Sequence, residues 1–151
     1  GTDILYSGTV SAAIEASIYN VPAIAFSMEV DWERYDEDYT VAAKIASKIV
    51  DKAEEKYLRN NLVLNVNIPK VKEEEIKGIK VCKLGKSTYK SEYVLIEDAD
   101  EKTYEIKSNR NKIEQKDTDL YYLSEGYVTL TPLHYDFTNF KILDEVTDIF
   151  E

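Results

Sequence analysis

The chain has 151 residues, within the usual size of one domain. Hydrophobic residues make up 44% of it and charged residues 32%, which supports a buried core and excludes a disordered chain. The formal net charge of −10 argues against binding to the backbone of a nucleic-acid polymer, and no apolar run reaches the roughly 18 residues of a membrane helix, so we expect no membrane partner.

The single cysteine, Cys82, limits the chemistry that thiols can supply. One cysteine can form neither an internal disulfide nor a cysteine-based metal site. Such usage is typical of a reducing, cytoplasmic compartment. Cys82 lies in the alternating stretch IKVCKL, so we interpret it as a half-buried packing residue rather than a nucleophile.

The first part of the chain alternates helices with strands. Apolar spacing predicts a helix over residues 9–20, which Pro22 prevents from continuing. The nearly continuous apolar run 23–28 predicts a central strand buried on both faces. A second amphipathic helix is expected over about 39–58, and the next strand over 62–69. This order is typical of a parallel sheet with helical crossovers.

Beyond Pro69 the segments become shorter and alternating, and they are rich in Tyr, Ile and Val. They predict antiparallel hairpins that extend from the parallel core, followed by a polar loop over 109–119. A final strand is expected over 125–133, and a terminal amphipathic helix over 139–150 with Thr138 as its N-cap. The alternating segments are residues 79–84, 89–98 and 102–108.

The turn before the first helix is the first candidate site. Gly8 allows a close backbone turn, Ser7 or Thr9 can cap the helix, and its free amides carry the positive end of the helix dipole. Such a terminus is suited to bind phosphate, although a plain N-cap accounts for the same residues. Asp3 is either a cap or a residue that orients metal-bound water, and spacing does not decide between them.

Two asparagines mark the strand over 62–69. Asn65 and Asn67 alternate with apolar residues, so both side chains lie on one face of the strand. An asparagine in a buried strand needs hydrogen-bond partners. The pair therefore either ties down neighbouring loops or lines a site.

The segment after the last strand holds the only histidine, His134. Any histidine acting as a general acid or base in this chain must be this one, with Asp136 as a candidate partner. A surface or interface position is the alternative reading of both residues.

Four blocks of the chain are informative when taken together: G-T-D-I-L-Y-S-G-T-V-S-A-A-x-E-A, V-P-A-I-A-F-S, L-N-V-N-I-P and G-Y-V-T-L-T-P-L-H-Y-D-F-T. In this order they resemble the SurE family of metal-dependent nucleotidases. The resemblance covers the family's C-terminal portion. It implies an α/β fold: the C-terminal part of a Rossmann-like, mostly parallel sheet with helices, protruding antiparallel β-hairpins and a C-terminal helix.

The resemblance also implies an activity. SurE proteins hydrolyse nucleoside 5′- and 3′-monophosphates, often also short polyphosphate, with one divalent cation, Mg²⁺ or Mn²⁺. The family's metal ligands would lie upstream of Gly1, so we expect no metal ligand in this chain and no activity from the chain alone. Ser7, Gly8 and Thr9 match the family's Ser-Gly-Thr turn, which implies a phosphate-binding role.

The resemblance also implies that the protein assembles as a homodimer or tetramer. It implies that His134 and Asp136 stabilise an interface rather than take part in catalysis. We expect 1–151 to be the C-terminal portion of a single SurE-like domain, without its N-terminal metal-binding part. Its expected parts are an α/β core part (1–69), a hairpin extension for oligomerisation (70–125) and the final strand and helix (126–151). The alternative is a non-catalytic nucleotide-binding or oligomerisation module.

Overall fold

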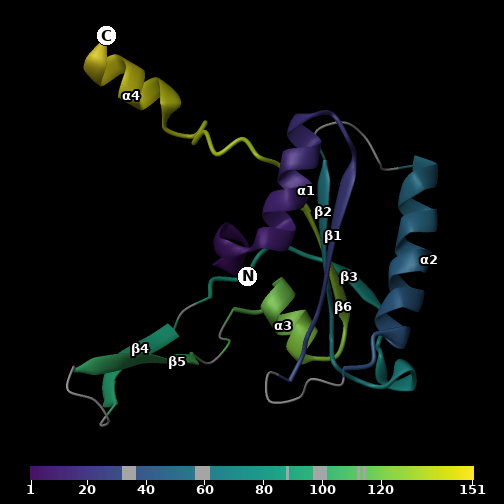
Figure 1. Cartoon of the computed structure of the whole chain (residues 1–151). Coiled ribbons are helices and arrows are strands. Elements are labelled where there is room, and N and C mark those ends of the chain that lie inside the picture. The colour runs from purple at the N-terminus through teal and green to yellow at the C-terminus, as the bar shows by residue number, and fades with distance from the viewer. Residues whose placement is uncertain (32–36, 57–61, 88, 97–101, 112, 114) are drawn as a thin grey trace.

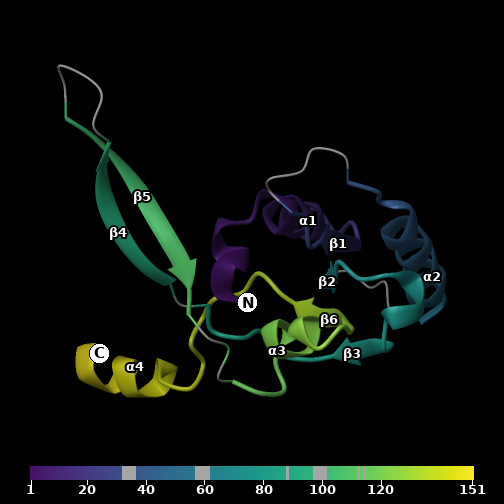
Figure 2. The same ribbon diagram turned by 90° about the horizontal axis from the view of Figure 1, so that it is seen from below.

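A four-stranded sheet with helices on both faces forms the body of the molecule, and a two-stranded hairpin and a terminal helix project from it (Figures 1 and 2). The computed structural model describes residues 1–31, 37–56, 62–87, 89–96, 102–111, 113 and 115–151. The α/β class expected from the sequence is confirmed.

The helices and strands up to Pro69 lie close to their expected positions, and the full set is as follows. The helices are η1 (Thr2–Tyr6), α1 (Gly8–Ile18), α2 (Thr40–Lys56), η2 (Glu73–Glu75), α3 (Asp119–Ser124) and α4 (Leu143–Phe150). The strands are β1 (Ala23–Met28), β2 (Val63–Ile68), β3 (Ile79–Val81), β4 (Tyr89–Ile96), β5 (Thr103–Arg110) and β6 (Val128–Leu133). Residues 57 and 58, the expected end of the second helix, lie outside the described residues.

The sheet order is β1-β2-β6-β3, and its strand directions are mixed. β1 runs parallel to β2 and β3 runs parallel to β6, whereas β2 and β6 are antiparallel. β2 is the most deeply buried strand. The expectation that 23–28 is a central strand buried on both faces is wrong for the described sheet, because β1 lies at its edge and only Ala25 is buried.

Two expectations beyond Pro69 are wrong. β3 pairs with β6 in the main sheet and is not part of a hairpin, so the arm consists of β4 and β5, which do pair antiparallel as expected. The expected polar loop lies between β5 and α3, a helix that was not expected; the Thr118 hydroxyl accepts the Tyr121 N–H and caps it. Thr138 does not cap the last helix: its N–H bonds to Asp136 in a turn, and α4 begins at Leu143.

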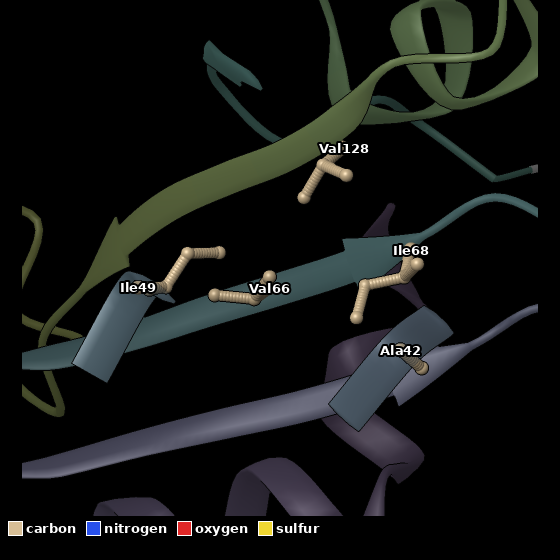
Figure 3. Close-up of a cluster of buried hydrophobic side chains, with 5 residues drawn as sticks. All are labelled: Ala42, Ile49, Val66, Ile68 and Val128. Atoms are coloured by element: carbon tan, nitrogen blue, oxygen red, sulfur yellow. The ribbon is translucent and has the colours of Figure 1, made fainter. Parts of the chain in front are cut away.

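The alternation of side chains gives the sheet two different faces. The face under α2 is apolar, and Figure 3 shows its core cluster: Ala42, Ile49, Val66, Ile68 and Val128. The opposite face is apolar only beneath α1. Beyond α1, cross-strand pairs make it polar, namely Ser27 with Asn67, Asn67 with Thr129, and Asn65 with Thr131. A polar floor on the α1 side of the sheet follows from this pattern.

Candidate functional site

A cavity of about 230 Å³ opens over this polar floor at the carboxyl ends of β1 and β2. In α/β folds, ligands commonly bind at the carboxyl ends of parallel strands. Its walls come from η1, the start of α1 and α3. The polar side chains in its lining are Asp3, Ser7, Ser27, Asn65, Asn67 and Asp119.

Ser7 is the N-cap of α1 and also lines this cavity. Its hydroxyl oxygen accepts the Val10 N–H at 3.2 Å, and its carbonyl accepts the Ser11 N–H at 2.9 Å. Gly8 and Thr9 are the first two helical residues, so their N–H groups have no acceptor within the helix. Both are exposed beside the cavity and do not line it.

The chain's own packing does not require a glycine at position 8. A Cβ built there would meet no atom within 4 Å. The expected reason for a glycine here, a turn in which a side chain would clash, is therefore wrong. The space beside Gly8 at the start of α1 is open.

Asp3 lies in η1 rather than at the start of α1, so it is not the cap of that helix. Its carboxylate accepts a hydrogen bond from the Tyr89 hydroxyl at 2.5 Å. This contact links the cavity wall to the first residue of β4. The other alternative for Asp3, orienting a metal-bound water, stays a prediction.

Asn65 and Asn67 do lie on one face of β2, and both line the cavity. Asn65 is only 2% exposed and faces Thr131 across the strand pair. Of the two alternatives for these asparagines, the structure favours lining a site. An amide side chain can donate and accept hydrogen bonds, so this floor can bind the hydroxyl or phosphate oxygens of a ligand.

His134 and Asp136 do not join this site. His134 lines a separate, mostly apolar cavity, together with Ile14 and Phe137 among others. Asp136 is exposed, and its Oδ1 accepts the Thr138 N–H at 2.8 Å. Hydrogen bonds from Thr138 hold the pKa of Asp136 below its usual range, and the nearby His134 lowers it further. Their role at an interface stays a prediction.

The sequence analysis missed Asp119, which lines the cavity and is 2% exposed. Its Oδ1 accepts the N–H groups of Gly85 at 2.7 Å and Leu120 at 2.8 Å, and its Oδ2 bonds to the Gly1 nitrogen. The signal was the pair Thr118-Asp119 ahead of Leu120, which is a helix-start pattern inside a stretch taken as a loop.

Comparison with known proteins decides the family. Residues 1–91 match the family model described as Survival protein SurE. The chain belongs to the SurE family. A curated protein named 5′-nucleotidase SurE from Clostridium botulinum strain Alaska E43 is 65% identical over the whole chain, and one of that name from Clostridium tetani is 47% identical over 98% of it.

A solved structure supports the same assignment. The SurE protein of Aquifex aeolicus is 36% identical and superposes with a TM-score of 0.82 over the whole chain. The chain spans about 60% of the length of that structure and of the curated SurE relatives named above. The resemblance noted in the four sequence blocks is confirmed.

The described residues of this SurE chain do not make up a metal centre. No group of three His, Cys, Asp or Glu side chains in the described ranges is placed to hold a cation. Both Asp119 oxygens already accept backbone donors, and Asp3 is bonded to Tyr89. In the same ranges no helix is long and apolar enough to cross a membrane.

Cys82 lies directly after β3 and is half-buried, as expected. Burial is the main cause that raises the pKa of its thiol above the ordinary value. A thiol is a poor nucleophile because the thiolate is the reactive form. The interpretation of Cys82 as a packing residue therefore fits the structure.

Proposed function

We propose that this chain supplies the phosphate-binding wall of a metal-dependent 5′/3′-nucleotidase. The observation that carries the proposal is the N-terminus of α1, where Ser7 opens onto a polar cavity at the carboxyl ends of β1 and β2. The name 5′-nucleotidase that the relatives carry supports nucleoside monophosphates as the substrate class. By the family resemblance, short polyphosphate is a further substrate.

Binding would rest on the donors at the helix start. The N–H groups of Gly8 and Thr9 and the Ser7 hydroxyl can donate to phosphate oxygens, and the helix dipole favours the negative charge. A volume of about 230 Å³ is below the 300–1,000 Å³ usual for a whole drug-sized ligand. The cavity therefore suits the phosphate and part of the sugar, with the base outside.

We further propose that the whole protein uses one divalent cation, Mg²⁺ or Mn²⁺, whose ligands lie outside these 151 residues. When bound, such a cation would stabilise the charge of the reacting phosphoryl group. The residues of this chain would bind and orient the phosphate oxygens. The single cysteine supports placing the protein in the cytoplasm.

The activity can be tested at two chain lengths. A protein of the relatives' length that contains this chain is expected to release phosphate from AMP or GMP with Mn²⁺, and EDTA should abolish the release. The 151-residue chain alone should bind AMP without turnover, because a hydrolase without its metal ligands loses the main stabilisation of developing charge. Phosphate release is measured colorimetrically, and binding by calorimetry.

The same experiment decides between the two functions. Strong turnover by the 151-residue chain alone would contradict the proposal that the chain supplies only the phosphate side. AMP binding without turnover at either length would favour the alternative, a non-catalytic nucleotide-binding or oligomerisation module. Mass spectrometry of each sample is the control for chain length.

We propose that residues 1–151 are one portion of a single SurE-like domain. The apolar sequence of β1, AIAFSM, suits a central strand, yet β1 lies at the edge of the described sheet. Further strands in a protein of the relatives' length would pair along this edge. They would pair with the edge of β1 that lies opposite to β2, and β1 would then be a central strand.

We also propose that the chain assembles with a second copy of itself. Many exposed apolar side chains lie on the hairpin and α4, both of which project from the body (Figures 1 and 2). A two-stranded hairpin and an eight-residue helix are each marginal in water on their own. A partner copy would cover them.

A charge on the hairpin should disrupt that assembly. Tyr93 is 74% exposed and pairs with Ile106 across the arm, so Tyr93→Glu is expected to shift sedimentation towards the monomer. Lys90→Glu, which places the same charge on the other face of β4, is the matched control and should keep the assembly. Sedimentation of the unsubstituted protein as a monomer at every concentration would contradict the proposal.

A further inference from the structure

A buried carboxylate connects three segments that are far apart in the sequence. Asp119 accepts the Leu120 N–H within α3, the Gly85 N–H from the loop after β3, and a bond from the terminal amino group of Gly1 ahead of η1, a nitrogen that is a peptide N–H wherever further residues precede Gly1. The first two donors share Oδ1, and the third uses Oδ2. Asp119 thus joins the start of η1 to the loop after β3 and to α3.

Further hydrogen bonds join η1 to the segment between β3 and β4 and to the first residue of β4. The Thr2 N–H donates to the Gly85 carbonyl at 2.9 Å, and the Ser87 N–H donates to the Thr2 hydroxyl oxygen at 3.0 Å. The Tyr89 hydroxyl donates to Asp3. We name residues 1–3, residues 85–87, Tyr89 and Asp119 the Asp119 clasp.

Two glycines of the Asp119 clasp have close neighbours. A Cβ at Gly1 would lie 2.4 Å from Ser87 Oγ and 2.9 Å from the Gly85 carbonyl oxygen, so a side chain there would force the backbone at Gly85 to shift. A Cβ at Gly85 would lie 3.0 Å from both Leu120 Cδ1 and Thr118 Oγ1, and these side chains would have to move by a few tenths of an ångström. Position 8, in contrast, is open.

We propose that Asp119 is a positioning residue for the phosphate-binding wall, acting through η1 on Ser7. η1 has no buried residue and no side-chain cap of its own. Ile4 packs, partly buried, against the cluster under α1, and the bonds of the Asp119 clasp hold the start of η1 over the cavity. Ser7 follows η1 directly and opens α1. A shift of η1 would therefore move the hydroxyl and the helix amides away from the phosphate.

The same bonds favour a structural role for Asp119 over a chemical one. Oδ1 accepts two N–H donors and Oδ2 accepts one, so three of the roughly four acceptor sites of the carboxylate are occupied. Hydrogen bonds from three donors also offset its negative charge, which would otherwise repel a phosphate in the same cavity. The positioning role rests on the proposed function.

The test replaces Asp119 by Asn in an active protein of the relatives' length. In that protein the Gly1 nitrogen is a peptide N–H. Asn keeps Oδ1 for Gly85 and Leu120 but presents to the Gly1 N–H an NH₂ group, which cannot accept. We expect kcat/KM for AMP to fall by about 10- to 100-fold, as for a displaced binding group, with faster hydrogen exchange at the Thr2 and Gly85 amides. The matched control is Asp117→Asn, which makes the same change at an exposed residue bonded to Tyr122 and should alter neither quantity.

Each outcome has one meaning. Asp119→Asn with wild-type kcat/KM per folded molecule overturns the positioning role, even if its melting temperature falls. If Asp119→Asn does not fold, Thr2→Val decides: it removes only the acceptor for Ser87 on an exposed residue, and must lower kcat/KM while Thr2→Ser restores it. Thr2→Val with wild-type kcat/KM overturns the role. An unsubstituted protein that releases no phosphate overturns the proposed function itself.

Discussion

Replacing Ile68 by alanine is expected to lower the free energy of unfolding by about 2–5 kcal/mol, the usual cost of removing a buried isoleucine side chain. Ile68 ends β2, is 2% exposed and packs in the α2-side cluster with Ala42 and Ile49 (Figure 3). The close-packed surroundings cannot collapse fully into the space, so a cavity adds to the lost transfer free energy. Urea unfolding with an unchanged m-value measures the effect.

The matched control is Ile79→Ala on β3 of the same sheet. It removes the same atoms from a side chain that is 46% exposed, so we expect a change nearer to the 0.5 kcal/mol or so usual for surface substitutions. Equal losses at Ile68 and Ile79 would contradict the placement of the core between α2 and β2.

Replacing Ser7 by aspartate is expected to lower kcat/KM for AMP by about 100-fold in an active protein of the relatives' length, comparable to losing one positioned donor. Aspartate caps helices as well as serine does, and its charge suits the helix dipole, so the melting temperature should stay near that of the unsubstituted protein. The same charge would repel phosphate from the cavity that Ser7 lines. Steady-state kinetics and thermal melting separate the two effects.

Two further substitutions control for the cap. Ser7→Ala removes both the cap and the donor, so it should cost about 1 kcal/mol of stability in addition to turnover. Ser7→Thr keeps both groups and should keep both properties. If Ser7→Asp hydrolyses AMP as well as the unsubstituted protein, Ser7 is a helix cap and nothing more.

The helices and strands up to Pro69 could be predicted because their signals are local. The spacing of Ala42, Ile45 and Ile49 marks one face of α2, and Ser7 followed by Gly8 marks the start of α1. Both patterns depend only on residues within a few positions of each other, and the structure confirms both elements.

Strand pairing beyond Pro69 could not be predicted in the same way. β3 has only three residues, and its partner β6 begins 47 positions after its last residue, so hydrogen bonds such as that from the Val128 N–H to the Gly78 carbonyl have no local signal. The six-residue helix α3 is too short for a periodic pattern, and its polar start was taken as part of a loop.

The residues of the candidate site also divide into those with a local signal in the sequence and those with long-range contacts only. Ser7 was found from its own neighbours, and the shared face of Asn65 and Asn67 follows from the two-residue period of a strand. Asp119 was missed because its partners Gly85 and Gly1 lie 34 and 118 positions away. A buried carboxylate bonded only through such long-range contacts has no signature in a single sequence.

The sequence by itself determined the α/β class, the helix and strand positions of the first part and the cap at Ser7, and its four blocks indicated the family by resemblance. The class, the elements and the cap depend on side-chain type and on spacing along the chain. Only the tertiary structure decided the antiparallel pairing of β2 with β6, the polar floor under α1 and the clasp that Asp119 makes. The reason is physical: each of these is a contact between segments that the chain brings together only when the sheet has formed and its two faces are covered.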